Sequence, residues 1–343
     1  MKIFVTRPIP DSGIRLLQDK AYEVVVNEEA KNRAATKEEI LVGVKNADAL
    51  LSVLTEKIDA EIMDAAGGTL KIIANYAVGF DNIDLEATKQ RNILVTNTPG
   101  VLTNTVAEHT FALMISIARR IAEADKFSRA GMYKAWGPEL LLGMDLSGKV
   151  LGIVGLGRIG SRVAYHGVRG FNMKVLYYDP KRNLEFERDF SAEGGSPARG
   201  GHGVSGGEKE FGAQYVANVE ELLPLCDFVS IHVPLLDSTR HLFNEARLKL
   251  MKPTAYLVNT SRGSIVDEAA LATALKKGTI KGAAIDVFEN EPEITPELKE
   301  LENIILTPHI ASATEETRQA MSKLAAENII EALEGRTPPN LVK

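Results

Sequence analysis

Residues 150–160 read Val150-Leu151-Gly152-Ile153-Val154-Gly155-Leu156-Gly157-Arg158-Ile159-Gly160. An apolar segment of strand length leads directly into three glycines spaced as G-x-G-x-x-G, at Gly155, Gly157 and Gly160. In such a stretch the first glycine permits a tight turn, and the second lets backbone amides approach a pyrophosphate. The third glycine allows the helix that follows to pack on the strand. The stretch therefore predicts a strand, a phosphate-binding turn and a helix.

An acidic residue follows the next apolar segment, as this kind of unit requires. Asp179 lies nineteen residues after Gly160, at the end of Val175–Tyr178. We expect its carboxylate to accept hydrogen bonds from the adenosine ribose and to repel a 2′-phosphate, which favours NAD. Lys181 and Arg182 come shortly afterwards and favour NADP instead, so NADP stays open as the alternative cofactor.

The same succession of strand-like and helix-like segments extends over the whole chain. Short apolar runs alternate with helix-length amphipathic segments, which predicts an α/β protein with parallel sheets made from βαβ units. The predicted strands of the first half are Lys2–Thr6, Tyr22–Val26, Ala49–Leu54, Leu70–Asn75 and Ile93–Asn97. Those of the second half are Val150–Val154, Val175–Tyr178, Asp227–Val233, Ala255–Asn259, Ile280–Val287 and Asn303–Leu306.

Three helices and one loop are predicted with particular bounds. Thr36 and Glu39 fit a capping box at the start of a helix that continues to Val44. One long helix is predicted over Thr103–Arg129, and a terminal helix over Glu315–Leu333 that returns to the first domain. Residues 191–212 are rich in glycine and poor in apolar side chains, so we expect a flexible surface insertion there.

Length and composition exclude several classes of protein. With 343 residues, of which 45% are hydrophobic and 25% charged, the chain is long enough for two globular domains. Its net charge of −6 and lack of a basic run disfavour nucleic-acid binding. The single cysteine, Cys226, is expected to be a buried apolar residue, and no metal site is predicted. No apolar run is long enough to span a membrane and no leader is visible, so we expect a cytoplasmic protein.

Three later segments carry polar or ionisable residues just beyond predicted strands, where open α/β sheets bind ligands. They are Asn259-Thr260-Ser261-Arg262-Gly263, Asp286-Val287-Phe288-Glu289-Asn290-Glu291-Pro292 and Thr307-Pro308-His309-Ile310. With these motifs and the glycine-rich turn, nearly the whole chain resembles the D-isomer-specific 2-hydroxyacid dehydrogenases. The resemblance extends to Asn75–Asn82, which looks like the substrate loop of that family, and to Thr98-Pro99-Gly100, which looks like its hinge.

The resemblance implies a catalytic role for three side chains. Arg262 is expected to hold the 2-oxo acid, because a guanidinium is permanently charged and donates two parallel hydrogen bonds to a carboxylate. His309 is expected to be the general acid, and Glu291 to orient its imidazole and stabilise the protonated form. Glu289 competes with Glu291 for this role, and we prefer Glu291 because the family motif places its glutamate directly before the proline. Amides of Val78 and Gly79 are expected to complete the substrate cradle.

The resemblance also implies a fold and a set of cofactor contacts. It implies two Rossmann-like, doubly wound parallel-sheet domains, with a flavodoxin-like substrate domain over 1–99 and 309–343 and an NAD-binding domain over 100–308. Asp286 is expected to contact the nicotinamide carboxamide. The remaining expected cofactor contacts are Gly155, Gly157, Arg158, Ile159, Gly160, Asp179, Val233, Pro234 and Thr260.

The activity implied by the resemblance is NAD(P)H-dependent reduction of a small 2-oxo acid. Glyoxylate or hydroxypyruvate is the expected substrate, because Trp136 stands where glyoxylate and hydroxypyruvate reductases carry a tryptophan. D-3-phosphoglycerate and D-lactate dehydrogenase remain alternatives, and so does a corepressor-like protein that senses NADH. The helix over Thr103–Arg129 and the apolar stretch Trp136–Leu142 predict a homodimer.

Overall fold

A computed structural model describes residues 1–189 and 213–342. The chain divides into two compact units, Met1–Leu102 with Ser312–Lys343, and Thr103–Ala311. The boundaries between the units follow Leu102 and Ala311, three residues after the boundaries predicted from the sequence, which follow residues 99 and 308. The predicted glycine-rich insertion, 191–212, falls outside the described residues.

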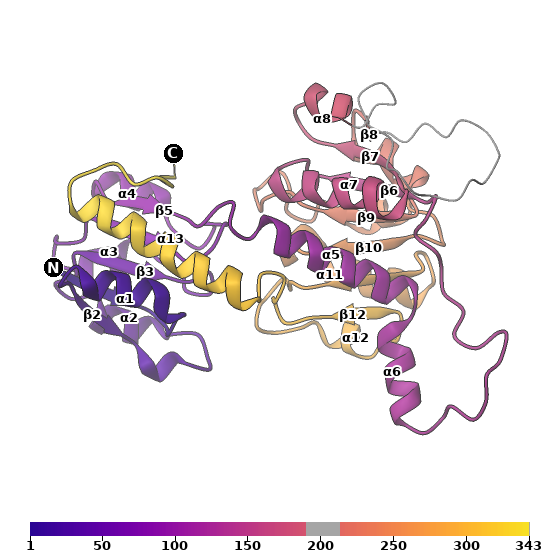
Figure 1. Ribbon diagram of the computed structural model, residues 1–343, viewed down its shortest axis with the longest axis horizontal. Coiled ribbons are helices and arrows are strands. Elements are labelled where there is room, and N and C mark those ends of the chain that lie inside the picture. Colours follow the sequence, from indigo (N-terminus) through magenta and orange to yellow (C-terminus); the bar gives the residue numbers. More distant parts are fainter. Residues whose placement is uncertain (190–212, 343) are drawn as a thin grey trace. The chain divides into compact units, whose positions relative to one another are not determined.

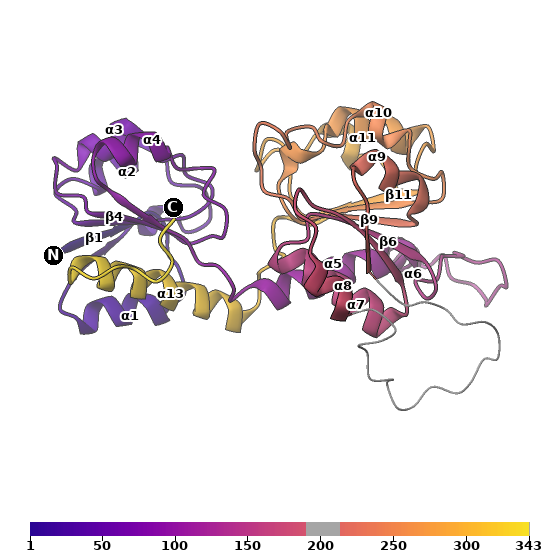
Figure 2. The ribbon, with the colours of Figure 1, turned by 90° about the horizontal axis from the view of Figure 1, so that it is seen from above.

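The first unit is built on a five-stranded parallel sheet in the order β2-β1-β3-β4-β5. Its strands are β1 (Lys2–Val5), β2 (Glu23–Val26), β3 (Ala49–Ser52), β4 (Ile72–Asn75) and β5 (Leu94–Thr96). Helices α1 (Asp11–Asp19) and α13 (Glu315–Leu333) cover one face, and α2 (Lys37–Gly43), α3 (Ala60–Ala65) and α4 (Leu85–Gln90) cover the other (Figure 2). This strand order is the flavodoxin-like one, which confirms the predicted fold of this part of the chain.

The last helix joins the two ends of the chain within the first unit. Helix α13 has the predicted bounds and packs on α1. The contact is very close at Gly13, where a Cβ would lie 2.2 Å from the backbone oxygen of Ser322. Because any larger residue at position 13 would force the two helices apart, this glycine sets their spacing.

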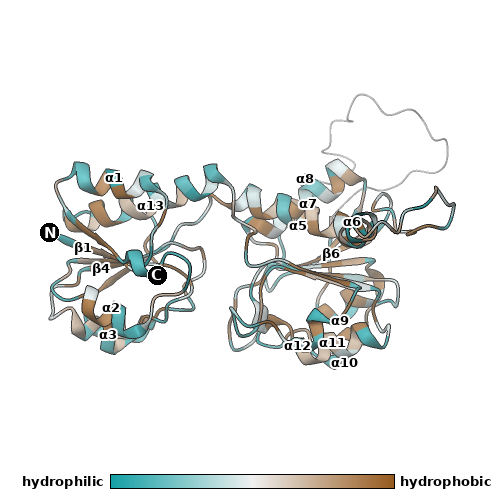
Figure 3. Ribbon diagram, turned by 90° about the horizontal axis from the view of Figure 1, so that it is seen from below, coloured by the Kyte–Doolittle hydropathy of each residue, from teal (hydrophilic) through white to brown (hydrophobic). Residues whose placement is uncertain are grey.

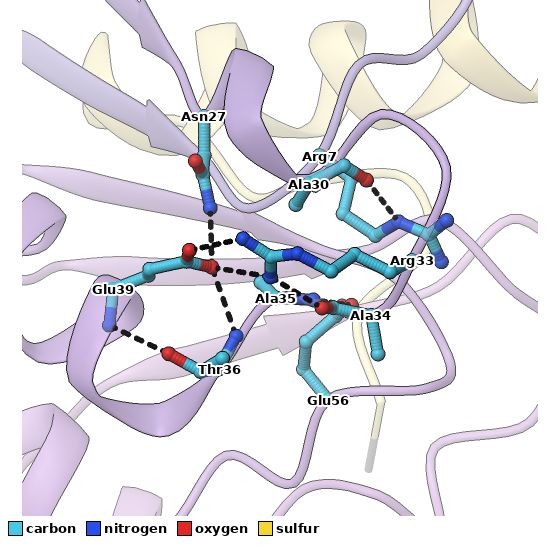
Figure 4. Close-up of polar contacts among 9 residues, drawn as sticks. All are labelled: Arg7, Asn27, Ala30, Arg33, Ala34, Ala35, Thr36, Glu39 and Glu56. Carbon is cyan, nitrogen blue, oxygen red and sulfur yellow. Dashed lines mark hydrogen bonds and ion pairs between the residues drawn. The ribbon is translucent and has the colours of Figure 1, made fainter.

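The predicted capping box at the start of α2 is present (Figure 4). The Glu39 amide donates to Thr36 Oγ1 at 3.3 Å, and the Glu39 carboxylate accepts from the Thr36 amide at 3.0 Å. The same carboxylate also accepts from the guanidinium of Arg33 and the side-chain amide of Asn27. One carboxylate thus holds both the start of the helix and the loop before it.

The second unit contains a seven-stranded parallel sheet in the order β12-β11-β10-β9-β6-β7-β8 (Figure 1). Its strands are β6 (Val150–Val154), β7 (Lys174–Tyr178), β8 (Ala213–Tyr215), β9 (Phe228–Ile231), β10 (Tyr256–Asn259), β11 (Gly282–Ile285) and β12 (Ile304–Leu306). The order reverses between β6 and β9, as in dinucleotide-binding Rossmann folds, so the predicted fold class is confirmed here too. Strand β8 was not among the predicted strands.

Helices cover both faces of this sheet. Helices α5 (Thr103–Ala118) and α7 (Arg158–Phe171) lie on one face, and α9 (Val219–Leu222), α10 (Glu245–Leu248) and α11 (Glu268–Lys276) lie on the other (Figure 2). Two further short helices are α8 (Leu184–Asp189) and α12 (Pro296–Lys299). The strands carry mainly hydrophobic residues while the helices are mixed, as Figure 3 shows, so the core lies against the sheet.

The predicted single helix over Thr103–Arg129 is wrong, because the structure contains two helices. Helix α5 ends at Ala118, and α6 (Ile121–Arg129) begins after Arg120, which has a left-handed φ of 55°. The Ala118 carbonyl accepts a hydrogen bond from the amide of Met144 at 2.8 Å instead of continuing the helix. A residue distant in the sequence therefore ends α5, although helix propensity favours its continuation.

The cysteine is buried, as predicted. Cys226 has no exposed surface, and burial raises the pKa of its thiol to about 12. A Cβ on Gly152 in β6 would lie 2.6 Å from the Cys226 sulfur, so the small residue in the strand makes room for the thiol. Among the described residues, no helix is long and apolar enough to cross a membrane.

Candidate active site

The glycine-rich turn leads from β6 into α7, and each glycine is needed for a different reason. Gly155 has φ +98°, and a Cβ there would lie 2.8 Å from the backbone of His232. A Cβ on Gly160 would lie 2.0 Å from the Gly155 oxygen. By contrast, a Cβ on Gly157 would meet nothing within 4 Å. The open space at Gly157, in front of the first amides of α7, fits a bound pyrophosphate.

Asp179 lies beside this turn, at the end of β7. One carboxylate oxygen accepts from the Leu156 amide at 2.8 Å, and the other accepts from the Lys181 amide at 3.1 Å. Asp179 therefore connects the glycine-rich turn to the loop after β7. This is the place at which an acidic residue contacts a ribose in dinucleotide-binding folds.

The other predicted cofactor residues also follow strand ends of the second unit. Arg158 is exposed and Ile159 partly buried at the start of α7, while Val233 and Pro234 follow β9. Thr260 follows β10, and its hydroxyl lies 3.0 Å from that of Thr110 on α5. Because the strands are parallel, their carboxyl ends meet at one edge of the sheet and bring these residues to that edge.

His309 and Glu291 form a hydrogen-bonded pair at the same edge. His309 Nδ1 lies 2.8 Å from Glu291 Oε2, and both side chains are 23% exposed. The other oxygen of Glu291 accepts from the Phe288 amide at 3.0 Å, which fixes the carboxylate. With Nδ1 bound to Glu291, Nε2 is the ring nitrogen that can transfer a proton to a substrate.

The second glutamate of the loop, Glu289, is bound elsewhere. Glu289 Oε1 lies 2.5 Å from Nε2 of His241 and 3.7 Å from Arg240. The structure therefore brings Glu291, and not Glu289, to His309. The pairing with His241 was not predicted, since that histidine stands in an unremarkable loop of the sequence.

Asp286 is fully buried beneath the loop that carries His309. Its carboxylate accepts from the Thr307 hydroxyl at 2.6 Å and from the amides of Ile310 and Ala311 at 2.9 and 2.7 Å. His109 Nε2 lies 3.5 Å from the same carboxylate. Burial alone would raise the pKa of Asp286, but the hydrogen bonds from His109, Thr307 and the two amides outweigh it and lower the pKa.

These bonds hold His309 in an uncommon backbone conformation. His309 has φ +53°, and its amide donates to the Asp286 carbonyl at 2.8 Å. A left-handed conformation costs a residue with a side chain about 1–2 kcal/mol, so the surrounding bonds must impose it. Asp286 thus positions the histidine, a role that the sequence did not suggest. Its contact with the nicotinamide carboxamide stays a prediction.

Arg262 follows β10 on a loop that packs against the loop of Glu291. Its Nη1 donates to the Ser261 carbonyl at 2.9 Å, and its own carbonyl accepts from the Asn259 side chain at 2.9 Å. A Cβ on Gly263 would lie 1.9 Å from the backbone of Phe288. The glycine therefore allows the arginine loop and the glutamate loop to lie in direct contact.

Val78 and Gly79 belong to the first unit, on the loop after β4. Their carbonyls accept from the side-chain amides of Asn97 and Asn75, at 2.7 and 2.8 Å respectively. Within the described part of the chain, neither of their amides donates a hydrogen bond. Their role in a substrate cradle stays a prediction.

His109 is the site residue that sequence reasoning missed most clearly. It lies on α5, more than a hundred residues before Asp286, and its only sequence signal is a polar ring on a buried helix. In residues 1–189 and 213–342, no group of three His, Cys, Asp or Glu side chains is arranged to hold a metal ion.

Comparisons with known proteins identify the family to which the chain belongs. The family profile for the D-isomer specific 2-hydroxyacid dehydrogenase NAD-binding domain matches residues 111–196 and 201–311. The glyoxylate reductase of Pyrococcus furiosus is 48% identical over 345 aligned positions, covering 99% of this chain and 95% of the relative. The glyoxylate reductase of Thermococcus litoralis is 47% identical, covering 99% and 96%.

Solved structures give the same result. A protein from Thermus thermophilus has a TM-score of 0.87 at 41% identity, with 100% of both chains covered. The NADPH-dependent glyoxylate/hydroxypyruvate reductase of Sinorhizobium meliloti, in complex with NADP and malonate, has a TM-score of 0.79 at 30% identity, covering 99% of this chain and 96% of that one. The chain belongs to the D-isomer specific 2-hydroxyacid dehydrogenase family and is an NAD(P)-dependent oxidoreductase.

Proposed function

We propose that this enzyme reduces glyoxylate or hydroxypyruvate to glycolate or D-glycerate. The observation that carries the proposal is the 2.8 Å contact between His309 and Glu291, on the sheet edge that also holds the glycine-rich turn. Relatives that are 45–48% identical over 99% of the chain are named glyoxylate reductase, which favours these substrates over D-lactate and 3-phosphoglycerate. The names also favour an enzyme over a corepressor-like sensor.

The residues divide the chemistry between them. When bound, the reduced nicotinamide supplies the hydride that adds to the carbonyl carbon of the substrate. His309 gives its proton to the carbonyl oxygen, and Glu291 orients the imidazole through Nδ1 so that Nε2 faces the substrate. Arg262 binds the substrate carboxylate and carbonyl oxygen, and the amides of Val78 and Gly79 are the proposed further donors to the carboxylate.

NAD is the proposed cofactor in preference to NADP. Asp179 is fixed beside the glycine-rich turn by the amides of Leu156 and Lys181, and its negative charge opposes a 2′-phosphate. Gly155, Gly157 and Gly160, with Arg158 and Ile159, form the pyrophosphate site. The predicted cytoplasmic location and the absence of a nucleic-acid partner stay predictions.

A homodimer is proposed from the segment that follows α5. Helix α6 has no buried residues, and the segment after it exposes Met132, Tyr133, Trp136 and Leu142. These side chains are 55%, 56%, 79% and 64% exposed. A patch of this kind is typical of a protein–protein contact, and the proposed occupant is a second copy of the chain.

The substrate assignment is tested by NADH oxidation with glyoxylate, hydroxypyruvate, pyruvate and 3-phosphohydroxypyruvate, followed by absorbance. We expect the highest kcat/KM with glyoxylate or hydroxypyruvate. Relatives of the chain are named glyoxylate reductase or glyoxylate/hydroxypyruvate reductase, and Arg262 is suited to bind the carboxylate of either acid. If none of the four acids is reduced, the proposal is contradicted. A clear preference for pyruvate or 3-phosphohydroxypyruvate would move the chain to one of the alternatives.

The two glutamates of the loop are distinguished by turnover. In Glu291→Gln a single amide oxygen has to serve both the Phe288 amide and His309 Nδ1, so the imidazole is no longer held and kcat should fall roughly tenfold or more. Glu289→Gln is the matched control, since Glu289 contacts His241 instead, and its kcat should change little. A larger loss of kcat in Glu289→Gln than in Glu291→Gln would overturn the assignment.

The positioning role of Asp286 is tested by Asp286→Asn. An amide has one acceptor oxygen, so Ile310 or Ala311 loses its hydrogen bond and kcat should fall roughly tenfold or more. Fluorescence titration of NADH separates this role from the predicted carboxamide contact. An unchanged NADH Kd beside the loss of kcat would place the effect on the His309 loop, whereas a parallel rise in Kd would support the contact with the cofactor.

The dimer is tested by Leu142→Asp. A buried charge at an apolar interface is unfavourable, so the mass in sedimentation equilibrium should fall from twice that of the 37.3 kDa chain toward that of one chain. Val42→Asp is the control, because Val42 is 66% exposed on α2, outside the proposed interface. A natural chain that sediments as a monomer would refute the dimer.

A further inference from the structure

We propose that Glu187 sets the preference for NAD by holding Arg182 in an ion pair, so that the guanidinium is not available to a 2′-phosphate. The inference rests on the proposed binding of NAD at the glycine-rich turn. It assigns a specificity role to Glu187, a residue outside the glycine-rich turn and the strand end that carries Asp179.

Arg182 stands where a 2′-phosphate would be recognised. It lies three residues after Asp179, on the loop that Asp179 holds through the Lys181 amide. In folds of this kind an arginine near the acidic position accommodates the 2′-phosphate of NADP. A guanidinium is suited to the task, because it donates paired hydrogen bonds to phosphate oxygens. In the sequence, Arg182 therefore weakens the preference for NAD that Asp179 predicts.

The guanidinium of Arg182 is already bound to a carboxylate of the chain. Its Nη2 lies 2.7 Å from Glu187 Oε2, and its Nε lies 2.9 and 3.3 Å from the two carboxylate oxygens. The guanidinium carbon also lies 5.8 Å from the centre of the Tyr215 ring. The side of the guanidinium formed by Nε and Nη2 is thus occupied by Glu187.

Glu187 is itself fixed by a buried tyrosine. The hydroxyl of Tyr177 donates to Glu187 Oε1 at 2.7 Å and accepts from the Asn183 amide at 2.9 Å. Burial, together with the hydrogen bond to Glu187, raises the pKa of Tyr177 to about 12, so the hydroxyl keeps its proton. Arg182 in turn holds the pKa of Glu187 below its ordinary value, so the carboxylate stays charged.

The exposed fractions of the two side chains indicate which member of the ion pair is free to move. The Glu187 side chain is 15% exposed, whereas that of Arg182 is 55% exposed. Glu187 is therefore the anchored partner, and Arg182 is the one that would have to leave to bind a phosphate. Since partly exposed ion pairs are weak, we expect Glu187 to reduce NADP affinity by a modest factor and not to abolish it.

The test measures binding of 2′,5′-ADP and of AMP by isothermal titration calorimetry at fixed ionic strength. Glu187→Gln keeps the acceptor for Tyr177 but removes the charge that holds Arg182. Its affinity for 2′,5′-ADP should rise roughly three- to fivefold, with AMP affinity unchanged. The ratio of kcat/KM for NADPH to that for NADH should rise by the same factor.

A double-mutant cycle identifies the guanidinium as the cause. Arg182→Ala should change 2′,5′-ADP affinity less than about twofold in the natural chain, but should remove the whole gain in the Glu187→Gln background. Glu185→Gln is the matched control. It removes the same charge from the same helix, α8, without touching the ion pair, and should have no effect on either ligand.

Three outcomes overturn the inference. The first is that Glu187→Gln does not raise the affinity for 2′,5′-ADP. The second is a rise in affinity that persists when Arg182→Ala is added, and the third is an equal rise in Glu185→Gln. The last two outcomes would show only the effect of removing a negative charge. In each case, intact NADH binding would leave the proposed function standing. A natural chain that binds neither NADH nor AMP would instead count against the proposed function itself.

Discussion

The candidate active site depends on the hydrogen bonds that the buried carboxylate of Asp286 accepts. His309 is catalytically useful only if its ring points toward Glu291 and a substrate, and its left-handed backbone is not one that a histidine adopts without constraint. The constraint comes from the two amides after His309 and the hydroxyl of Thr307, all of which donate to Asp286. Because the carboxylate lies out of water and carries a full charge, these bonds are stronger than those between neutral groups.

The parallel sheet explains why residues so distant in the sequence meet. Turns that follow β6, β7, β9, β10, β11 and β12 all lie at one edge, so each strand delivers one short loop to the site. Glycines then allow these loops to approach one another closely. Gly263 lets the loop of Arg262 contact the backbone of Phe288, and Gly155 lets the glycine-rich turn contact the backbone of His232. The close packing of these backbones brings the loops at this sheet edge into contact with one another.

The sequence was sufficient for the features that depend on local pattern. The glycine turn, the parallel βαβ organisation, the capping box at Thr36 and the bounds of Glu315–Leu333 follow from spacing and propensity, and the resemblance to a known family added the division into two sheets. It was not sufficient where distant residues decide. The break after Ala118 depends on a hydrogen bond from Met144, and the contact of His109 with Asp286 joins a helix to a loop in another part of the sequence. His241, the partner of Glu289, lies 48 residues before it and had no sequence signal.

The charges near the cofactor site also depend on contacts that the sequence does not show. Lys181 and Arg182 both count as cations near the cofactor site, and the chain as a whole has a net charge of −6. Neither count describes the site, because a nearby opposite charge offsets the attraction between a cation and a ligand. Arg182 is bound by Glu187, and Lys181 is connected to Asp179 through its backbone and not through its ammonium group. Two adjacent cations in the sequence therefore do not supply two cations to a 2′-phosphate, because the fold has already paired Arg182 with a carboxylate.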